Sequence, residues 1–71
     1  MISKKELKKA LLVHDVSVQM IAEAAGVSES TVYRWIANPE KMNIGVVELI
    51  KDITKMDREE FTRIFYPETV A

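Results

Sequence analysis

Helix-start signals recur at short intervals along this chain, and their spacing limits the fold more than any other feature. A serine or aspartate stands immediately before an apolar helical pattern at Ser3, Ser17, Ser28 and Asp57. The side-chain oxygen of such a residue accepts a hydrogen bond from a backbone N–H of the first helical turn, which has no partner inside the helix. The chain is therefore expected to fold into short helices.

Stop signals divide the chain into five helices. Gly26 ends the second helix, because glycine readily takes the left-handed conformation found after a helix, and Asn38-Pro39 ends the third. β-branched residues show no sustained alternation, so no sheet is expected. We expect helices over residues 4–14, 18–25 and 29–37, a fourth after a loop at 38–43, and a fifth that starts after Asp57 and is closed by Pro67.

Apolar residues at helical spacing give each helix an inward face. The expected core residues are Leu7, Ala10, Leu11, Ile21, Ala22, Ala25, Val46, Leu49, Ile50, Ile53, Phe61, Ile64 and Phe65. With 71 residues and no cysteine, the chain is expected to form one all-α domain (1–71), a compact bundle stabilised by this core without disulfides. No apolar run reaches the ~18 residues of a membrane span, so a cytoplasmic protein is expected.

The segment 17–37 holds the most informative pattern. Its two helices are separated only by residues 26–28, so the chain must turn sharply there. Such a turn needs a small residue where the helices cross, which is Ala22, and a residue that tolerates positive φ, which is Gly26. The segment therefore predicts two helices packed closely across a tight turn.

A helical wheel of residues 29–37, drawn at ~100° per residue, separates two faces. One face holds Thr31, Val32, Trp35 and Ile36, and the other holds Glu29, Ser30, Tyr33, Arg34 and Ala37. Trp35 is expected in the core because of its spacing with Val32 and Ile36. The second face carries donors, acceptors and an aromatic ring, which are the groups that a helix needs to read base edges in the major groove of DNA.

These residues resemble the helix–turn–helix of the Cro and phage-repressor family. The matching positions are Ile21-Ala22, Gly26-Val27-Ser28, Ser30-Thr31-Val32 and Arg34-Trp35. The resemblance is best over residues 17–36, and the order of five helices is similar over residues 1–66. It implies a lambda-repressor-like DNA-binding domain. Because a separate dimerisation domain is lacking, the chain is most similar to the short Cro-like regulators.

The chain departs from the family pattern at two places. The family often pairs an arginine of the first helix with a glutamate at the end of the third, but the corresponding residues here are Leu11 and Ile36. A joint exchange of both partners for apolar residues can be neutral or stabilising. The family's frequent glutamine at the start of the second helix is displaced to Gln19, with Val18 before it.

The resemblance and the wheel together make Glu29, Ser30, Tyr33 and Arg34 the candidate base contacts. Arg34 leads, because an exposed arginine bridges guanine O6 and N7; the alternative is a solvated surface arginine. Glu29 either accepts a hydrogen bond from cytosine N4 or complements the dipole of its own helix. Tyr33 either contacts a thymine methyl or a phosphate or is simply exposed, and Ser30 is either a base contact or plain helix surface.

The candidate contacts to the DNA backbone are Ser17, Gln19, Ser28, Asn38, Lys41 and Asn43. The first three are equally explained as caps or polar surface, although helix N-termini also hold phosphates. The resemblance places the other three where the family commonly grips the backbone, and Asn38 has a second role as a helix stop. A basic run at Lys4, Lys5, Lys8 and Lys9 is either a solvated face or a further backbone contact.

The predicted function is sequence-specific binding of double-stranded operator DNA by a small phage-type or bacterial transcriptional regulator. A homodimer on a pseudo-palindromic site is expected, with half-sites ~34 Å apart. The dimer contact is expected in a dimerisation tail at residues 61–71. It is assigned to side chains interpreted as lying beyond what the core needs, which are Phe65, Tyr66 and Val70. The alternative is an antirepressor or modulator that binds a phage repressor protein through the same fold.

Catalysis, a cofactor and a metal site are not expected. His14 is the only histidine, cysteine is absent, and no glycine-rich phosphate loop or nucleophile motif occurs. The net charge of −1 is unusual for a nucleic-acid binder. However, residues 1–41 hold six Lys/Arg against five acids, and residues 42–71 hold four against six. The charge therefore permits DNA binding, predicts weak non-specific binding, and leaves the modulator interpretation open.

Overall fold

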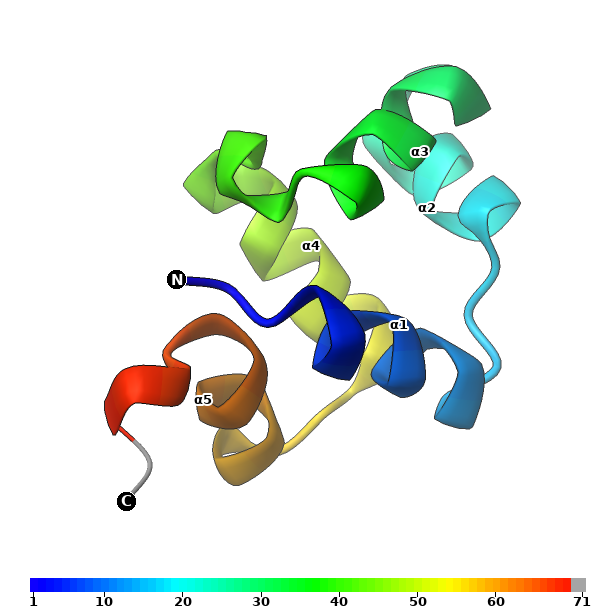
Figure 1. Ribbon diagram of the computed structural model, residues 1–71. Helices are drawn as coiled ribbons and strands as arrows, with labels where there is room; N and C mark the ends of the chain where they lie inside the picture. Colours follow the sequence, from blue (N-terminus) through cyan, green and yellow to red (C-terminus); the bar gives the residue numbers. More distant parts are fainter. Residues whose placement is uncertain (70–71) are drawn as a thin grey trace.

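The computed structural model describes residues 1–69, which are helical and contain no strand (Figure 1). Its α-helices are α1 (Lys4–Val13), α2 (Val18–Ala25), α3 (Glu29–Ala37), α4 (Ile44–Thr54) and α5 (Arg58–Phe65). Two 3-10 turns are added, η1 (Pro39–Lys41) and η2 (Pro67–Thr69). The expected all-α fold of five helices is confirmed over the described residues.

The helix boundaries agree with the sequence prediction to within a residue, with a few differences. The first helix ends at Val13, and His14 is its C-cap instead of its last residue. The expected loop at 38–43 contains η1, whose Pro39 is buried. Pro67 follows α5 as expected, but it also opens η2.

The predicted caps form hydrogen bonds at the starts of the helices. The side chains of Ser3, Ser17, Ser28 and Asp57 each accept from the backbone N–H of the residue three positions later. Asn43 does the same for α4, accepting from the N–H of Val46 at 2.9 Å. These bonds satisfy amides that have no acceptor within their own helix.

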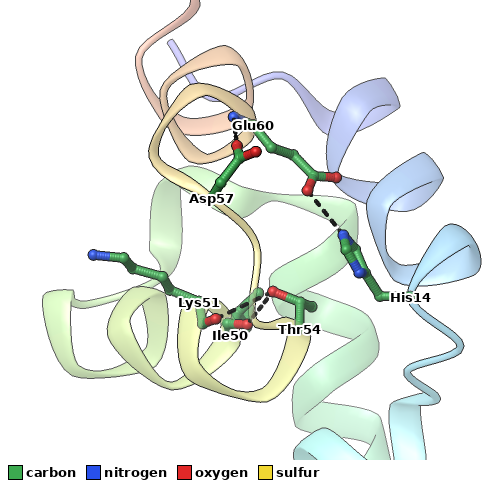
Figure 2. Close-up of polar contacts among 6 residues, drawn as sticks. All are labelled: His14, Ile50, Lys51, Thr54, Asp57 and Glu60. Atoms are coloured by element: carbon green, nitrogen blue, oxygen red, sulfur yellow. Dashed lines mark hydrogen bonds and ion pairs between the residues drawn. The ribbon is translucent and has the colours of Figure 1, made fainter.

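The cap of α5 also joins two distant helices. Asp57 Oδ1 accepts from the Glu60 N–H at 2.8 Å. In a capping box, the Glu60 carboxylate would turn back and accept from the Asp57 N–H. Here it points to α1 instead, and its Oε1 lies 2.8 Å from His14 Nε2 (Figure 2). This partly buried contact connects the C-cap of α1 to the first turn of α5.

The core is formed by one cluster of buried apolar side chains drawn from all five helices and from the connections between them. It consists of Leu7, Ala10, Leu11, Val16, Ile21, Ala22, Val32, Ile36, Val46, Ile50, Met56, Ile64 and Phe65. Thr54 is also buried, and its hydroxyl donates to Ile50 O at 2.8 Å (Figure 2). Leu11 and Ile36, the positions of the exchanged charge pair, both lie in this cluster.

One predicted site residue belongs to the core instead of the surface. Phe65 is only 4% exposed. Its expected place on the inward face of the fifth helix is therefore confirmed, and the interpretation that it belongs to a dimer contact beyond what the core needs is wrong. It sits in the last turn of α5 beside Ile64, and its ring centroid lies 4.9 Å from that of Phe61. Tyr66 is exposed as predicted. Val70 lies outside the described residues.

The helices are arranged so that α2 and α3 form one end of the molecule and α5 the opposite end (Figure 1). The Ser3 N–H donates to Ile64 O at 2.8 Å and so holds the start of α1 against α5. At the exposed amino terminus, the Met1 amino group donates a hydrogen bond to Glu68 Oε2, which raises the pKa of that amino group and lowers the pKa of the Glu68 carboxyl. Within residues 1–69, no helix is long and apolar enough to cross a membrane.

Candidate functional site

The turn between α2 and α3 places the candidate site. Gly26 has φ +71°, in the left-handed region. The N–H groups of Gly26 and Val27 both point back to the carbonyl oxygen of Ala22, with the Val27 bond at 3.0 Å. Ala22 itself is buried. The sequence prediction for this turn is confirmed, because the small residue and the left-handed residue occupy the expected positions.

The predicted division of α3 into two faces is also confirmed. Val32 and Ile36 are buried, and Trp35 packs against the core from a half-buried position. The candidate base contacts Glu29, Ser30, Tyr33 and Arg34 are all exposed. The helix therefore presents these four side chains together on the side turned away from the core.

The exposed side chains of α3 are not used to hold the fold together. Within residues 1–69, no hydrogen bond or ion pair involves the side chain of Glu29, Ser30, Tyr33 or Arg34. Tyr33 is 59% exposed, although its ring is large and apolar. Their donors and acceptors are thus available to a ligand without breaking any hydrogen bond or ion pair within residues 1–69.

The first turn of α2 holds two of the predicted backbone contacts. The Ser17 hydroxyl accepts from the Met20 N–H at 3.1 Å, and the Ser17 N–H donates to the Met20 thioether sulfur at 3.5 Å. The serine hydroxyl is therefore engaged in the cap. Gln19 is exposed and, within the described part of the chain, forms no side-chain hydrogen bond.

Ser28 serves α3 in the same way. Its hydroxyl accepts from the Thr31 N–H at 3.3 Å and lies 3.1 Å from the Thr31 hydroxyl. The interpretation of Ser17 and Ser28 as caps is confirmed, and a phosphate contact from either serine stays a prediction.

The remaining predicted backbone contacts gather after the C-terminal end of α3. Asn38 is the C-cap of α3, Lys41 ends η1, and Asn43 caps α4, and all three are exposed. The oxygen of the Asn43 amide is used in its cap, which leaves the NH₂ group facing no acceptor among residues 1–69.

Lys4 also lies in this region, although the sequence indicated only that it belongs to a basic run on the first helix. Its Nζ donates to the carbonyl oxygen of Ala37 at 3.3 Å, at the end of α3. A positive charge is favourable there because the last carbonyls of a helix carry partial negative charge. The contact joins residues 33 positions apart, so no local sequence signal identifies it.

An apolar groove lies between α4 and α5. We call it the α4–α5 groove; it has a volume of about 440 Å³ and is lined by Met42, Ile44, Val47, Glu48, Lys51, Phe61 and Tyr66. Ile44 is 79% exposed, and Lys51 Nζ lies 5.2 Å from the centre of the Phe61 ring. Sequence reasoning missed Ile44 because a single apolar residue at the start of a helix carries no distinctive signal.

Within residues 1–69, no group of three or more His, Cys, Asp or Glu side chains is placed to hold a metal ion. Comparisons of the chain with protein-family models, with curated proteins and with solved structures found no match.

Proposed function

We propose that the protein binds double-stranded DNA in a sequence-specific manner, as a small Cro-like transcriptional regulator with a lambda-repressor-like domain. The observation that carries the proposal is the exposed face of α3, where four polar or aromatic side chains form no hydrogen bond or ion pair within residues 1–69 and stand opposite a buried face. On this proposal α3 enters the major groove and α2 lies across the backbone. The protein is a binding protein without catalytic activity, and it acts in the cytoplasm of a bacterial or phage-infected cell.

The base contacts follow from the chemistry of the α3 face. Arg34 presents a planar fork of donors that matches guanine O6 and N7, and Glu29 presents an acceptor for cytosine N4. Tyr33 offers its ring to a thymine methyl, and Ser30 either donates or accepts. These four side chains do not give up any hydrogen bond or ion pair within residues 1–69 when they engage DNA.

The backbone contacts are proposed to lie on either side of α3. At the start of α2, Gln19 offers its amide beside the first-turn N–H groups. After α3, Lys41 and the amide of Asn43 lie on the same stretch as Asn38, and Lys4 is held at the end of α3 by its bond to Ala37. Few cations take part, so non-specific affinity is expected to be low and base contacts to supply most of the selectivity.

The first prediction is that selection from random duplex DNA yields a defined, pseudo-palindromic sequence. Footprinting should show protection of two half-sites ~34 Å apart. Affinity should fall as salt rises, with the modest slope expected for a few phosphate contacts. If selection returns no sequence and the protein instead forms a stoichiometric complex with a phage repressor, the modulator interpretation replaces the DNA-binding proposal. The net charge of −1 is the observation that favours the modulator interpretation.

The dimer that this model requires is proposed to form through the α4–α5 groove. A two-fold interface brings the same patch of both copies together, so the patch must complement itself. The groove meets this condition because it carries exposed apolar surface at Ile44 and Tyr66. It also carries one acidic and one basic residue, Glu48 and Lys51. Glu48 of one copy would then face Lys51 of the other.

We therefore expect Ile44→Glu to shift the protein toward monomer in sedimentation experiments. A buried, unpaired carboxylate is unfavourable where the Ile44 side chain made an apolar contact, so dimerisation should weaken at least about tenfold. Leu12→Glu is the matched control, because Leu12 is 83% exposed on a different helix. The proposed interface is wrong if both variants self-associate as the parent protein does, or if the parent is monomeric at high concentration and on DNA.

A further inference from the structure

The outward side of α1 combines cations with large apolar side chains that the fold does not use. We call this patch the α1 outer face; it consists of Lys5, Lys8, Lys9, Leu12 and Val13. Leu12 is 83% exposed and Val13 is 67% exposed, although both are large and apolar. Neither side chain is buried within this fold, because it is the opposite side of α1 that faces the core.

The three lysines surround Leu12 on the helix surface. Lys8 and Lys9 stand four and three residues before Leu12, which are the spacings at which helical side chains are neighbours. Lys5 lies one further turn back on the same side. Within residues 1–69 no carboxylate forms an ion pair with any of the three, so their positive charge is not neutralised by the fold.

A shallow hollow lies beside this patch, where α1 meets the connection to α2. It has a volume of about 230 Å³ and is lined by Leu11, Leu12, Asp15, Val16 and Ser17. Leu11 and Val16 are themselves buried, so the hollow has apolar walls that belong to the core. The chain turns at Asp15, which has φ +57°, and this turn forms one side of the hollow.

We propose that the α1 outer face docks an acidic amphipathic helix of a partner protein. The partner places one apolar side chain in the hollow beside Leu12 and sets its carboxylates against Lys5, Lys8 and Lys9. Charge complementarity selects an acidic partner, and the exposed Leu12 and Val13 select one that also carries apolar groups. This surface is distinct from the exposed face of α3.

Two other anionic partners fit the patch less well. The phosphates of DNA would pair with the lysines but would gain nothing from covering Leu12 and Val13, since burial of apolar surface is favourable only against an apolar partner. A membrane surface needs a broad apolar stripe along a helix, whereas α1 presents its two exposed apolar residues on a single turn. A protein helix with one apolar anchor satisfies both parts of the patch.

Asp15 determines the direction of the partner. Its carboxylate lines the hollow at the C-terminal end of α1 and repels an acidic group there, while the lysines lie toward the N-terminal end. The partner's apolar anchor must therefore lie near Asp15 and its carboxylates further along α1. Asp15→Asn is expected to strengthen binding for this reason.

The test is an NMR titration of the full chain with a synthetic acidic peptide. The peptide is an amphipathic helix of glutamates with leucines on one face, and its control has the same glutamates with alanine at each leucine position. Backbone amide shifts should change along α1 and at residues 14–17 with the leucine peptide and hardly at all with the alanine peptide. Shift changes centred on α3 or on the α4–α5 groove, or equal binding of both peptides, would overturn the proposal.

Matched variants separate the contributions of charge and of the apolar anchor. Lys5→Gln with Lys8→Gln should weaken binding of the leucine peptide several-fold, because two exposed ion pairs with the peptide are lost. The control, Arg58→Gln with Arg63→Gln, has the same net charge and should bind as the parent does. Leu12→Gln should weaken binding by a similar factor, because it removes the exposed apolar side chain of the patch.

Two further arms identify the class of partner. Vesicles of phosphatidylserine and phosphatidylcholine that shift the same α1 amides more strongly than the leucine peptide would assign the patch to a lipid surface instead. The operator duplex should leave Leu12 and Val13 unshifted. Loss of peptide binding together with retained operator binding in Leu12→Gln would support the proposal and leave the DNA-binding proposal unaffected, because the two activities have separate readouts.

Discussion

Arg34→Ala is expected to abolish sequence-specific DNA binding while leaving the helical fold intact. Each bidentate contact to guanine is worth about 1–3 kcal/mol of discrimination against the wrong base, so a dimer that uses two loses about 2–6 kcal/mol. The fold should be unaffected because Arg34 is exposed and its side chain pairs with nothing in residues 1–69. Affinity for the selected operator should fall to that for a scrambled duplex.

The measurement is fluorescence anisotropy on the operator and on the scrambled duplex, with circular dichroism as the check of folding. Arg63→Ala is the control, because Arg63 is also exposed but lies on α5, at the opposite end of the molecule (Figure 1). Arg34→Lys keeps the charge and loses the planar fork, so it should retain non-specific affinity and lose discrimination. Unchanged discrimination in Arg34→Ala would remove this residue from the proposed site.

Ile50→Ala is expected to destabilise the protein more than any exposed substitution considered above. Ile50 is 1% exposed in α4, and truncation of a buried isoleucine costs about 2–5 kcal/mol. A domain of this size has a free energy of unfolding of only about 3–5 kcal/mol. A large fraction of the variant should therefore be unfolded at room temperature, and DNA binding should be lost with the fold, since α4 packs against α2.

The same substitution in the same helix provides the control. Ile44 is 79% exposed in the single chain, so Ile44→Ala should change the free energy of unfolding of the monomer by no more than about 0.5 kcal/mol. Urea denaturation followed by circular dichroism measures both variants at a protein concentration low enough to keep the chain monomeric, because dimerisation adds to apparent stability. Similar losses at the two positions under these conditions would mean that Ile44 is buried by a different packing of α4.

The helices and their ends could be read from local sequence. A cap acts over three or four residues, so Ser3, Ser17, Ser28 and Asp57 mark helix starts wherever they occur with the right neighbours. The turn at Gly26 is equally local, because its left-handed conformation and the small Ala22 are requirements of two adjacent helices. The division of α3 into two faces follows from helical periodicity alone.

Burial was harder to predict for residues in the connections between helices. Val16 and Met56 are buried in the core although they lie outside the helices, where no periodicity indicates which way a side chain points. Conversely, Leu49 and Ile53 keep the helical apolar pattern of α4 but are only half-buried. Periodicity gives the direction of a helix face, whereas the position of the neighbouring helix decides how much of that face is covered.

Phe65 shows the same limit at the end of α5. Its helical spacing placed Phe65 on the inward face of α5, but its position in the C-terminal tail also made it a candidate dimer contact. The structure decides between the two, because Phe65 is only 4% exposed. The Ser3 N–H bond to Ile64 O holds the start of α1 against this same turn of α5, a contact between distant residues that no local pattern indicates.

By itself, the sequence determined where the helices begin and end, that residues 1–69 form no sheet, and which side chains α3 presents to solvent, because each depends on hydrogen bonds and periodicity within a few residues. The tertiary structure decided which apolar residues are buried, brought Lys4 to the end of α3 and Glu60 to His14, and formed the groove and the hollow. These features join residues distant in the chain, so they depend on how whole helices pack and not on any local pattern.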